Sequence, residues 1–206
     1  AHVKHPVGFV DDEDFNAGQQ DLAALELVDQ AAGREPQLTK PPGSLGRLEE
    51  LSHWLAAWQG RHPATMDNVR AHVFAGNHGV TAKGVSAYPS EVTVQMVGNF
   101  QAGGAAINQL CKTFDIDLKV DALDLDKPTH DFSESPAMSE DDVISAFSHG
   151  MTQVEAGTDI LCLGEMGIGN TTSAAAICHS LYGGEASDWT GPGTGVGGDA
   201  LSDKAQ

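Results

Sequence analysis

The sequence predicts an α/β fold with a mainly parallel, Rossmann-like sheet flanked by helices, and a small helical subdomain from the N-terminal part. Short apolar runs at residues 71–75, 118–123 and 159–163 have the length of buried strands. Helical patterns separate these runs, and glycine-rich loops follow the first and the third. Strands that alternate with helices form parallel sheets. Because such sheets bind ligands at the carboxyl ends of their strands, a ligand is expected there.

The N-terminal 62 residues are predicted to form the helical portion. Apolar residues recur at helical spacing over residues 22–32 and again over residues 45–58, where Ser44 can cap the second helix. Between the two helices, residues 39–44 contain two prolines and a glycine, which cannot continue a helix and so predict a turn. Residues 63–206 are then predicted to form one α/β nucleotide-binding domain.

Three further helices are predicted in this second domain. Ser90 is expected to cap a helix whose apolar positions extend from residue 92 to residue 110. Ser139, with Asp142 three residues later, is a capping-box signal for a helix that continues to about residue 154. Small polar residues then open a helix over residues 171–182.

Composition excludes several classes of function. The 206 residues contain 11 Lys and Arg against 29 Asp and Glu, so a formal charge of −18 argues against nucleic acid or an anionic membrane as a partner. No apolar run approaches the roughly 20 residues of a membrane span. Three cysteines without a C-x-x-C pair make neither a disulfide framework nor a zinc site, which predicts a reducing cytoplasm and no bound metal. Any phosphate ligand must be bound without a broad basic surface.

The most informative segment is Gly-Glu-Met-Gly-Ile-Gly-Asn-Thr-Thr at residues 164–172. Glycines permit tight turns, and free N–H groups at the start of a helix attract phosphate. The alternative is a strand-to-helix turn with ordinary capping. Glu165 in this loop could be a general base if burial raises its pKa, or a structural carboxylate that accepts backbone hydrogen bonds.

Three other features leave alternatives open. The glycine run at residues 191–198 formally contains G-x-G-x-x-G, and it could line a nucleotide pocket or be a plain loop. Lys204 could complete a phosphate clamp or be an exposed helix lysine. His78, which follows the first strand, could be a general base or could order its loop through a hydrogen bond.

Six segments in this order together resemble the nicotinate-nucleotide–dimethylbenzimidazole phosphoribosyltransferase family of cobalamin lower-ligand assembly. They are KPPGSLGRLE at 40–49, NHGV at 77–80, VSAYP at 85–89, VTVQM at 92–96, GGAAI at 103–107 and GEMGIGNTT at 164–172. The resemblance extends from about residue 39 to the end of the chain. It implies transfer of phosphoribose from nicotinate mononucleotide to 5,6-dimethylbenzimidazole with inversion at the anomeric carbon, without a cofactor, by a homodimer.

The resemblance also implies roles for particular residues. Glu165 matches an active-site glutamate of the family that removes a proton or orients the base. The segments that line the base pocket contain Tyr88, Gln95, Met96 and Met166. The segments around the phosphoribosyl group contain Gly167, Gly169, Asn170, Thr171, Thr172, Gly193, Thr194 and Lys204.

In one respect the chain departs from the family. Family members are longer, and their principal catalytic glutamate lies in a C-terminal part without a counterpart here, so the α/β domain is expected to be truncated at its C-terminus. A protein of only this length is expected to show impaired or absent turnover. The rival interpretation is a catalytically incomplete nucleotide-binding or regulatory module. A third is the same enzyme with a different acceptor base, in which Tyr88 would be the first residue to test.

Overall fold

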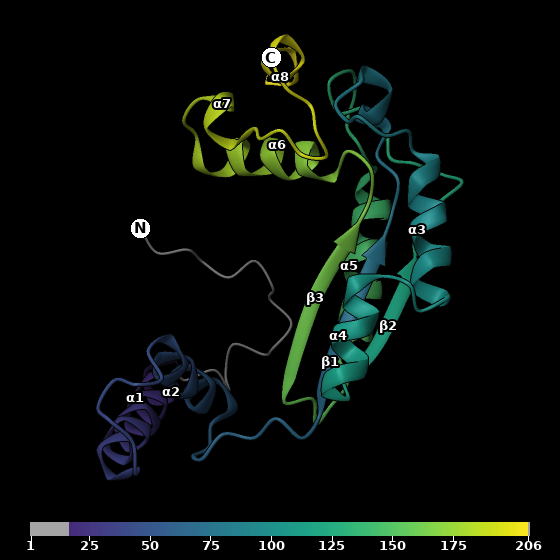
Figure 1. The fold of residues 1–206 in the computed structure, drawn as a ribbon. Coiled ribbons are helices and arrows are strands. Elements are labelled where there is room, and N and C mark those ends of the chain that lie inside the picture. The colour runs from purple at the N-terminus through teal and green to yellow at the C-terminus, as the bar shows by residue number, and fades with distance from the viewer. Residues whose placement is uncertain (1–16, 206) are drawn as a thin grey trace. The chain divides into compact units, whose positions relative to one another are not determined.

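The protein was analysed as a computed structural model that describes residues 17–205. The chain divides into two compact units, Ala1–Asp67 and Asn68–Gln206. Figure 1 shows helices alone in the described part of the first unit, and a sheet with helices around it in the second. The predicted fold class is thereby confirmed.

The first unit contains α1 (Ala17–Arg34), the 3₁₀ helix η1 (Glu35–Gln37) and α2 (Arg47–Gln59), and α1 packs along α2. The turn between them is held by Lys40, whose Nζ lies 2.9 Å from Glu35 Oε2 and 2.6 Å from Glu49 Oε1. Ser44 does not cap α2, contrary to the prediction, because the helix begins three residues later behind Gly46 with φ of 53°.

The second unit is built on a parallel sheet of three strands. They are β1 (Val69–Ala75), β2 (Asp117–Ala122) and β3 (Ile160–Met166), in the order β2-β1-β3. The third strand is longer than its apolar run predicts, because it keeps its register with β1 through the pairs Phe74–Glu165 and Ala75–Met166. Glu165 therefore lies on a strand and not in the loop that follows.

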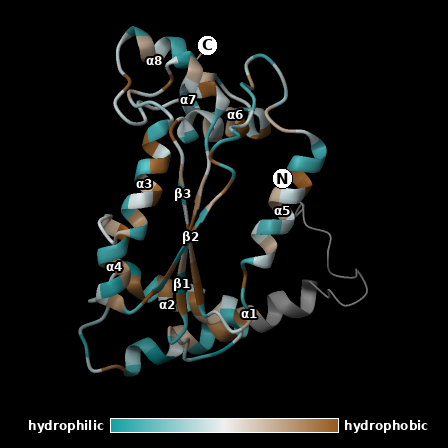
Figure 2. Cartoon of the chain, turned by 90° about the vertical axis from the view of Figure 1, so that its right-hand side faces the viewer, coloured by the Kyte–Doolittle hydropathy of each residue, from teal (hydrophilic) through white to brown (hydrophobic). Residues whose placement is uncertain are grey.

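Helices cover the two faces of this sheet. Figure 2 shows α3 (Glu91–Gln101) and α4 (Ala106–Phe114) on one face and α5 (Glu140–Thr152) on the other. The single helix predicted from residue 92 to residue 110 is interrupted, because Gly103 has φ of 78° and the Asn108 side chain accepts a hydrogen bond from Ala105 N at 3.1 Å. Ser90 is itself helical and makes no capping bond.

The helix α5 confirms its capping-box signal. Ser139 Oγ accepts a hydrogen bond from Asp142 N at 3.1 Å, and Asp142 Oδ2 accepts one from Ser139 N at 3.3 Å. No helix of residues 17–205 is long and apolar enough to cross a bilayer.

The remaining helices lie beyond the carboxyl ends of the strands (Figure 1). They are the 3₁₀ helix η2 (Gly79–Lys83), α6 (Asn170–Tyr182), α7 (Ala186–Trp189) and α8 (Asp199–Lys204). The core beneath them is made of small residues, among them Ala71, Val73 and Ala75 on β1. By contrast, β3 borders no described strand on its outer side, and 71% of Leu163 there is exposed.

Candidate functional site

Two turns meet at the carboxyl end of the sheet, one after β1 and one after β3. Gly76 N donates to Met166 O at 3.0 Å, which extends the strand pairing into the turns. A Cβ atom on Gly167 would lie 2.4 Å from Gly76 O and 2.9 Å from His78 Nε2. Glycine is therefore required at position 167 by a close backbone approach, which supports the glycine-loop interpretation of this segment.

The N–H groups at the start of α6 are partly occupied by the protein itself. Asn170 N donates to Gly167 O at 3.1 Å, Thr171 N donates to the Asn170 side chain at 2.7 Å, and Thr172 N donates to Gly169 O at 3.0 Å. Within residues 17–205, the N–H groups of Gly167 and Gly169 have no acceptor. Both glycines are buried, and their N–H groups are the donors that this turn leaves for a phosphate.

A third segment, the glycine run at residues 191–198, brings Lys204 to the same helix. Lys204 Nζ donates to Gly191 O at 3.1 Å and to Thr171 Oγ1 at 3.4 Å. A Cβ atom on Gly193 would lie 2.9 Å from Thr171 Oγ1 and 3.2 Å from Lys204 Nζ. Burial lowers the pKa of Lys204, and no carboxylate of the described residues forms an ion pair with it. Three sequence-predicted residues, Thr171, Gly193 and Lys204, thus converge.

Glu165 is joined to the start of α6 by a hydrogen bond that its carboxylate accepts from Asn170 Nδ2. Its side chain reaches solvent, yet the surrounding turns reduce its hydration enough to raise the pKa of the carboxyl. A raised pKa is what a general base requires, whereas a carboxylate that accepts several backbone N–H bonds would show the opposite shift.

The four residues of the predicted base pocket are less closely grouped. Tyr88 is 53% exposed, and within the described chain no hydrogen bond or ring contact joins Tyr88, Gln95, Met96 and Met166. Because side chains alternate along a strand, Met166 and Glu165 project from opposite faces of the sheet. The structure therefore brings the phosphoribosyl residues together more clearly than the base-pocket residues.

Ser86 connects the two predicted groups and was missed by sequence reasoning. Its Oγ lies 2.7 Å from Thr194 Oγ1 in the glycine run, and it accepts a hydrogen bond from Tyr88 N at 3.3 Å. A hydroxyl two residues before Tyr88 was the available signal, but nothing in the sequence places it opposite Thr194.

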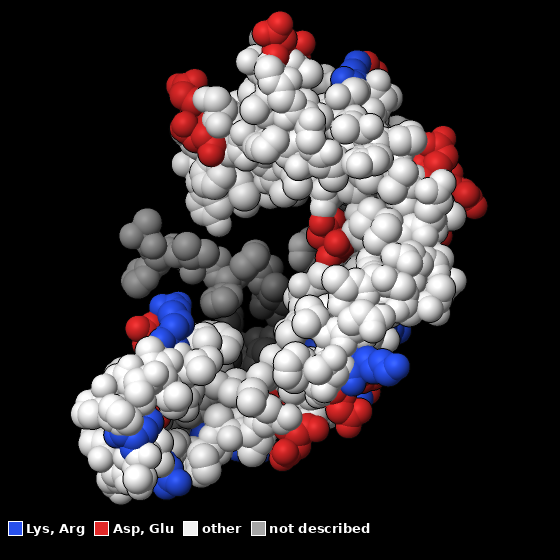
Figure 3. Space-filling view, in the orientation of Figure 1, with Lys and Arg blue, Asp and Glu red and all other residues white. Residues whose placement is uncertain are grey.

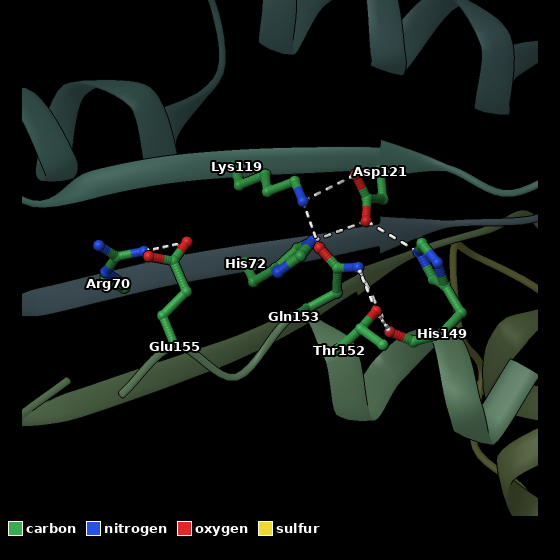
Figure 4. A network of polar contacts seen from close by, with 8 residues as sticks. All are labelled: Arg70, His72, Lys119, Asp121, His149, Thr152, Gln153 and Glu155. Carbon is green, nitrogen blue, oxygen red and sulfur yellow. Dashed lines mark hydrogen bonds and ion pairs between the residues drawn. The ribbon is translucent and has the colours of Figure 1, made fainter. Parts of the chain in front are cut away.

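A second polar cluster lies on the face of the sheet that α5 covers (Figure 4). Asp121 Oδ2 lies 3.1 Å from Nε2 of His72, which is 3% exposed, and 3.0 Å from Nε2 of His149 on α5. Burial opposes ionisation of Asp121, but the hydrogen bond with His149, the Lys119 charge and the nearby His72 ring outweigh it and hold its pKa below the usual range. The three residues are far apart in the sequence, so local spacing could not reveal the cluster.

Asp121 and Glu165 lie in the same row across the sheet. Both occupy positions in register with Phe74 of β1, one on each side of it. In a parallel sheet, residues in register project from the same face, so Glu165 faces the α5 side. The Phe74 ring between them stacks on His72, with centroids 4.2 Å apart.

Charge and donor chemistry restrict what this region can bind. Figure 3 shows acidic side chains scattered over the visible face of the α/β unit with few basic ones among them. The described residues hold no group of three or more His, Cys, Asp or Glu side chains arranged for a metal ion. The candidate site is therefore a set of backbone amides, hydroxyls and one lysine, beside a carboxylate.

Comparisons with known proteins agree with this chemistry. A family model described as DBI_PRT, phosphoribosyltransferase, matches residues 22–206. A protein of Ruegeria sp. (strain TM1040) named nicotinate-nucleotide–dimethylbenzimidazole phosphoribosyltransferase is 59% identical over 169 residues, which cover 82% of this chain and 50% of that protein. A protein of the same name from Rhizobium rhizogenes (strain K84) is 55% identical over 194 residues, covering 93% of this chain and 57% of that protein.

Solved structures give the same result. The crystal structure of CobT from Thermus thermophilus superposes with a TM-score of 0.75 at 40% identity, covering 87% of this chain and 60% of that chain. A second structure from this organism, named as the same phosphoribosyltransferase, gives a TM-score of 0.73 at 36% identity. The chain spans between 50% and 60% of the lengths of the relatives compared here.

Proposed function

We propose that this chain, which belongs to the DBI_PRT phosphoribosyltransferase family, transfers phosphoribose from nicotinate mononucleotide to 5,6-dimethylbenzimidazole. The products are α-ribazole 5′-phosphate and nicotinate. The observation that carries the proposal is the convergence of Thr171, Gly193 and Lys204 at the start of α6, which follows the unbonded amides of Gly167 and Gly169 along the chain. This group of donors suits the phosphate of a phosphoribosyl group.

The phosphate would be bound mainly by dipoles. The Gly167 and Gly169 N–H groups and the Thr171 hydroxyl donate to its oxygens, and Lys204 supplies a charge. Because Lys204 is partly desolvated and has no carboxylate partner among residues 17–205, its charge is available to an anion. An acidic protein can in this way bind a phosphate without a basic surface.

The chemical step needs a base and an oriented anomeric carbon. A benzimidazole nitrogen attacks C1′, the bond from C1′ to the nicotinate nitrogen breaks, and that nitrogen keeps the bonding electron pair. The benzimidazole loses its N–H proton, which we assign to the Glu165 carboxylate because burial raises its pKa towards that of a useful base. The Asn170 amide orients the carboxylate through its hydrogen bond.

The remaining parts of the proposal concern the base pocket, the domain and the assembly. Tyr88, Gln95, Met96 and Met166 are proposed to line the slot for the flat base, which Ser86 and Thr194 would close from the side of the glycine run. Residues 63–206 would form the nucleotide-binding domain. We also propose a homodimer in the cytoplasm, where the three free cysteines would remain reduced.

An assay of product formation tests the proposal. The chain is incubated with nicotinate mononucleotide and dimethylbenzimidazole, and released nicotinate and α-ribazole phosphate are measured by chromatography. We expect both products in equal amounts, at a rate that need only be measurable, and binding of the mononucleotide by calorimetry. Binding without nicotinate release would contradict the proposed transfer and would favour a nucleotide-binding module. Nicotinate release only in the presence of adenine or another base would show that the acceptor is not dimethylbenzimidazole.

A further inference from the structure

The peptide group of Ile168, in the middle of the turn between β3 and α6, is bound by side chains from two other segments. Ile168 N donates to Thr93 Oγ1 on α3 at 3.2 Å, and Thr81 Oγ1 on η2 donates to Ile168 O at 2.9 Å. Thr93 is 0% exposed and Ile168 is 4% exposed. Because water cannot replace either partner at a buried peptide, both hydrogen bonds are needed to satisfy it.

The glycines on either side of Ile168 are enclosed by the same segments. The His78 ring lies against Gly167, where a Cβ atom would be 3.0 Å from His78 Cδ2, and a Cβ atom on Gly169 would be 2.7 Å from Thr81 Oγ1. His78 Nδ1 also lies 3.0 Å from the hydroxyl of Ser173 in the first turns of α6. Burial lowers the pKa of His78, so a neutral ring is favoured in this position.

We propose that Thr93, Thr81 and His78 are positioning residues that fix the turn at residues 167–169, so that the Gly167 and Gly169 amides are aimed at the phosphoribosyl group. This inference rests on the proposed function. It adds three residues, from α3, η2 and the loop after β1, that are not expected to contact the substrate themselves.

The turn at residues 167–169 differs from the strand before it and the helix after it in what holds it in place. The strand before the turn is held by its pairing with β1, and the helix after it by its own hydrogen bonds. The turn between them is held from outside its own chain segment by Thr93 and Thr81, while His78 also contacts Ser173 of α6. Since backbone donors bind an anion only when they are correctly oriented, a small displacement of the turn reduces ligand binding more than it reduces stability.

The main test uses Thr93→Val and Thr93→Ser in the full chain. Valine has nearly the shape of threonine but cannot accept the Ile168 hydrogen bond, whereas serine keeps the acceptor. We expect Thr93→Val to weaken binding of nicotinate mononucleotide roughly tenfold by calorimetry. The affinity of Thr93→Ser for the mononucleotide is expected to stay within about twofold of that of the unaltered chain, because serine keeps the hydroxyl that accepts the Ile168 hydrogen bond. Binding of nicotinate alone, which has no phosphate, measures the contribution of the base.

Thr113→Val is the matched control, because Thr113 is exposed on α4 and, among residues 17–205, its hydroxyl donates only to Gln109 O of its own helix. It is expected to bind the mononucleotide normally. If Thr93→Val does not fold, Thr81→Val and Thr81→Ser at the half-buried position 81 provide the same comparison.

The outcomes separate the two proposals. If the unaltered chain does not bind nicotinate mononucleotide, the proposed function and the positioning role are both wrong. If it binds and Thr93→Val and Thr81→Val bind equally well, only the positioning role is wrong. If the valine variants lose affinity and the serine variants keep it, while the thermal midpoints of each pair stay similar, the positioning role is supported.

Discussion

Lys204 Nζ lies 3.4 Å from the hydroxyl of Thr171, although 33 positions separate the two residues in the chain. The contact joins α8 to the first turn of α6, and the glycine run between them makes the approach possible. A charge is thereby placed next to a helix start in a protein that is otherwise strongly acidic.

Lys204→Met tests this charge. Methionine keeps most of the apolar chain but removes the ammonium, so affinity for nicotinate mononucleotide should fall about 10- to 100-fold, the range for a hydrogen bond with a charged donor. Calorimetry at fixed ionic strength measures the loss. Lys112→Met, on exposed α4 and without an ion pair among the described residues, should leave affinity unchanged. An equal loss of affinity in both variants would show that the net charge of the protein matters and would contradict a specific role of Lys204.

Glu165→Gln should depress turnover by about 100-fold or more while leaving mononucleotide affinity nearly unchanged, since a general base contributes in the transition state. Steady-state kinetics and calorimetry give the two quantities. Unchanged turnover would remove Glu165 from the mechanism.

The pH dependence of the same residue has a definite sign. Because the folded pKa of Glu165 is raised, turnover should fall at a higher pH than an ordinary glutamate would cause, as the base becomes protonated. For stability, the folded state binds this proton more tightly than the unfolded state, so the free energy of unfolding decreases as pH rises through the raised pKa. Glu165→Gln should thus be neutral or stabilising at pH 7, as chemical denaturation would show.

Asp121→Asn should destabilise the fold, because His72 and His149 would lose a charged acceptor; the loss is expected to be about 1–3 kcal/mol by urea denaturation at pH 7. The folded pKa of Asp121 is lowered, so its contribution is present above the unfolded pKa and is lost as pH falls through the folded pKa. The stability difference between the two proteins should therefore shrink below about pH 4. A difference independent of pH would contradict this.

Gly167→Ala should destabilise the chain by several kcal/mol, on the order of other forced overlaps with backbone, since its Cβ would lie 2.4 Å from Gly76 O. Gly150→Ala is the matched control in α5, where a Cβ meets nothing within 4 Å. That change should stabilise by about 0.5–1 kcal/mol through helix propensity. Thermal unfolding of both proteins compares them, and similar midpoints would show that the turn can relax.

Local signals predicted much of the fold. Ser139 and Asp142 form their capping box as expected, because that motif depends only on residues three apart. The three apolar runs form strands, because a short apolar run between turn residues is a local signal for a strand. The break between α3 and α4 was not predicted, because apolar positions recur at helical spacing on both sides of residues 102–105, where Gly103 takes a positive φ.

The site was predictable only in its outline. Glycines and small polar residues marked the turn at residues 164–172, but the position of Glu165 within β3 follows from pairing with β1. The bond of Thr93 to Ile168 across 75 positions is a tertiary contact without a local signal. Roles that depend on such contacts could not be assigned from spacing.

Among residues 17–205 no strand pairs with the outer edge of β3, which has a consequence for the behaviour of concentrated solutions. An unpaired strand edge with an exposed apolar residue such as Leu163 is a template on which a second copy can add a strand and begin aggregation. The formal charge of −18 makes copies of the chain repel one another, and this repulsion extends over a Debye length of about 10 Å at 0.1 M salt. The acidity that complicates phosphate binding thus acts as a colloidal barrier, and high salt would weaken that barrier.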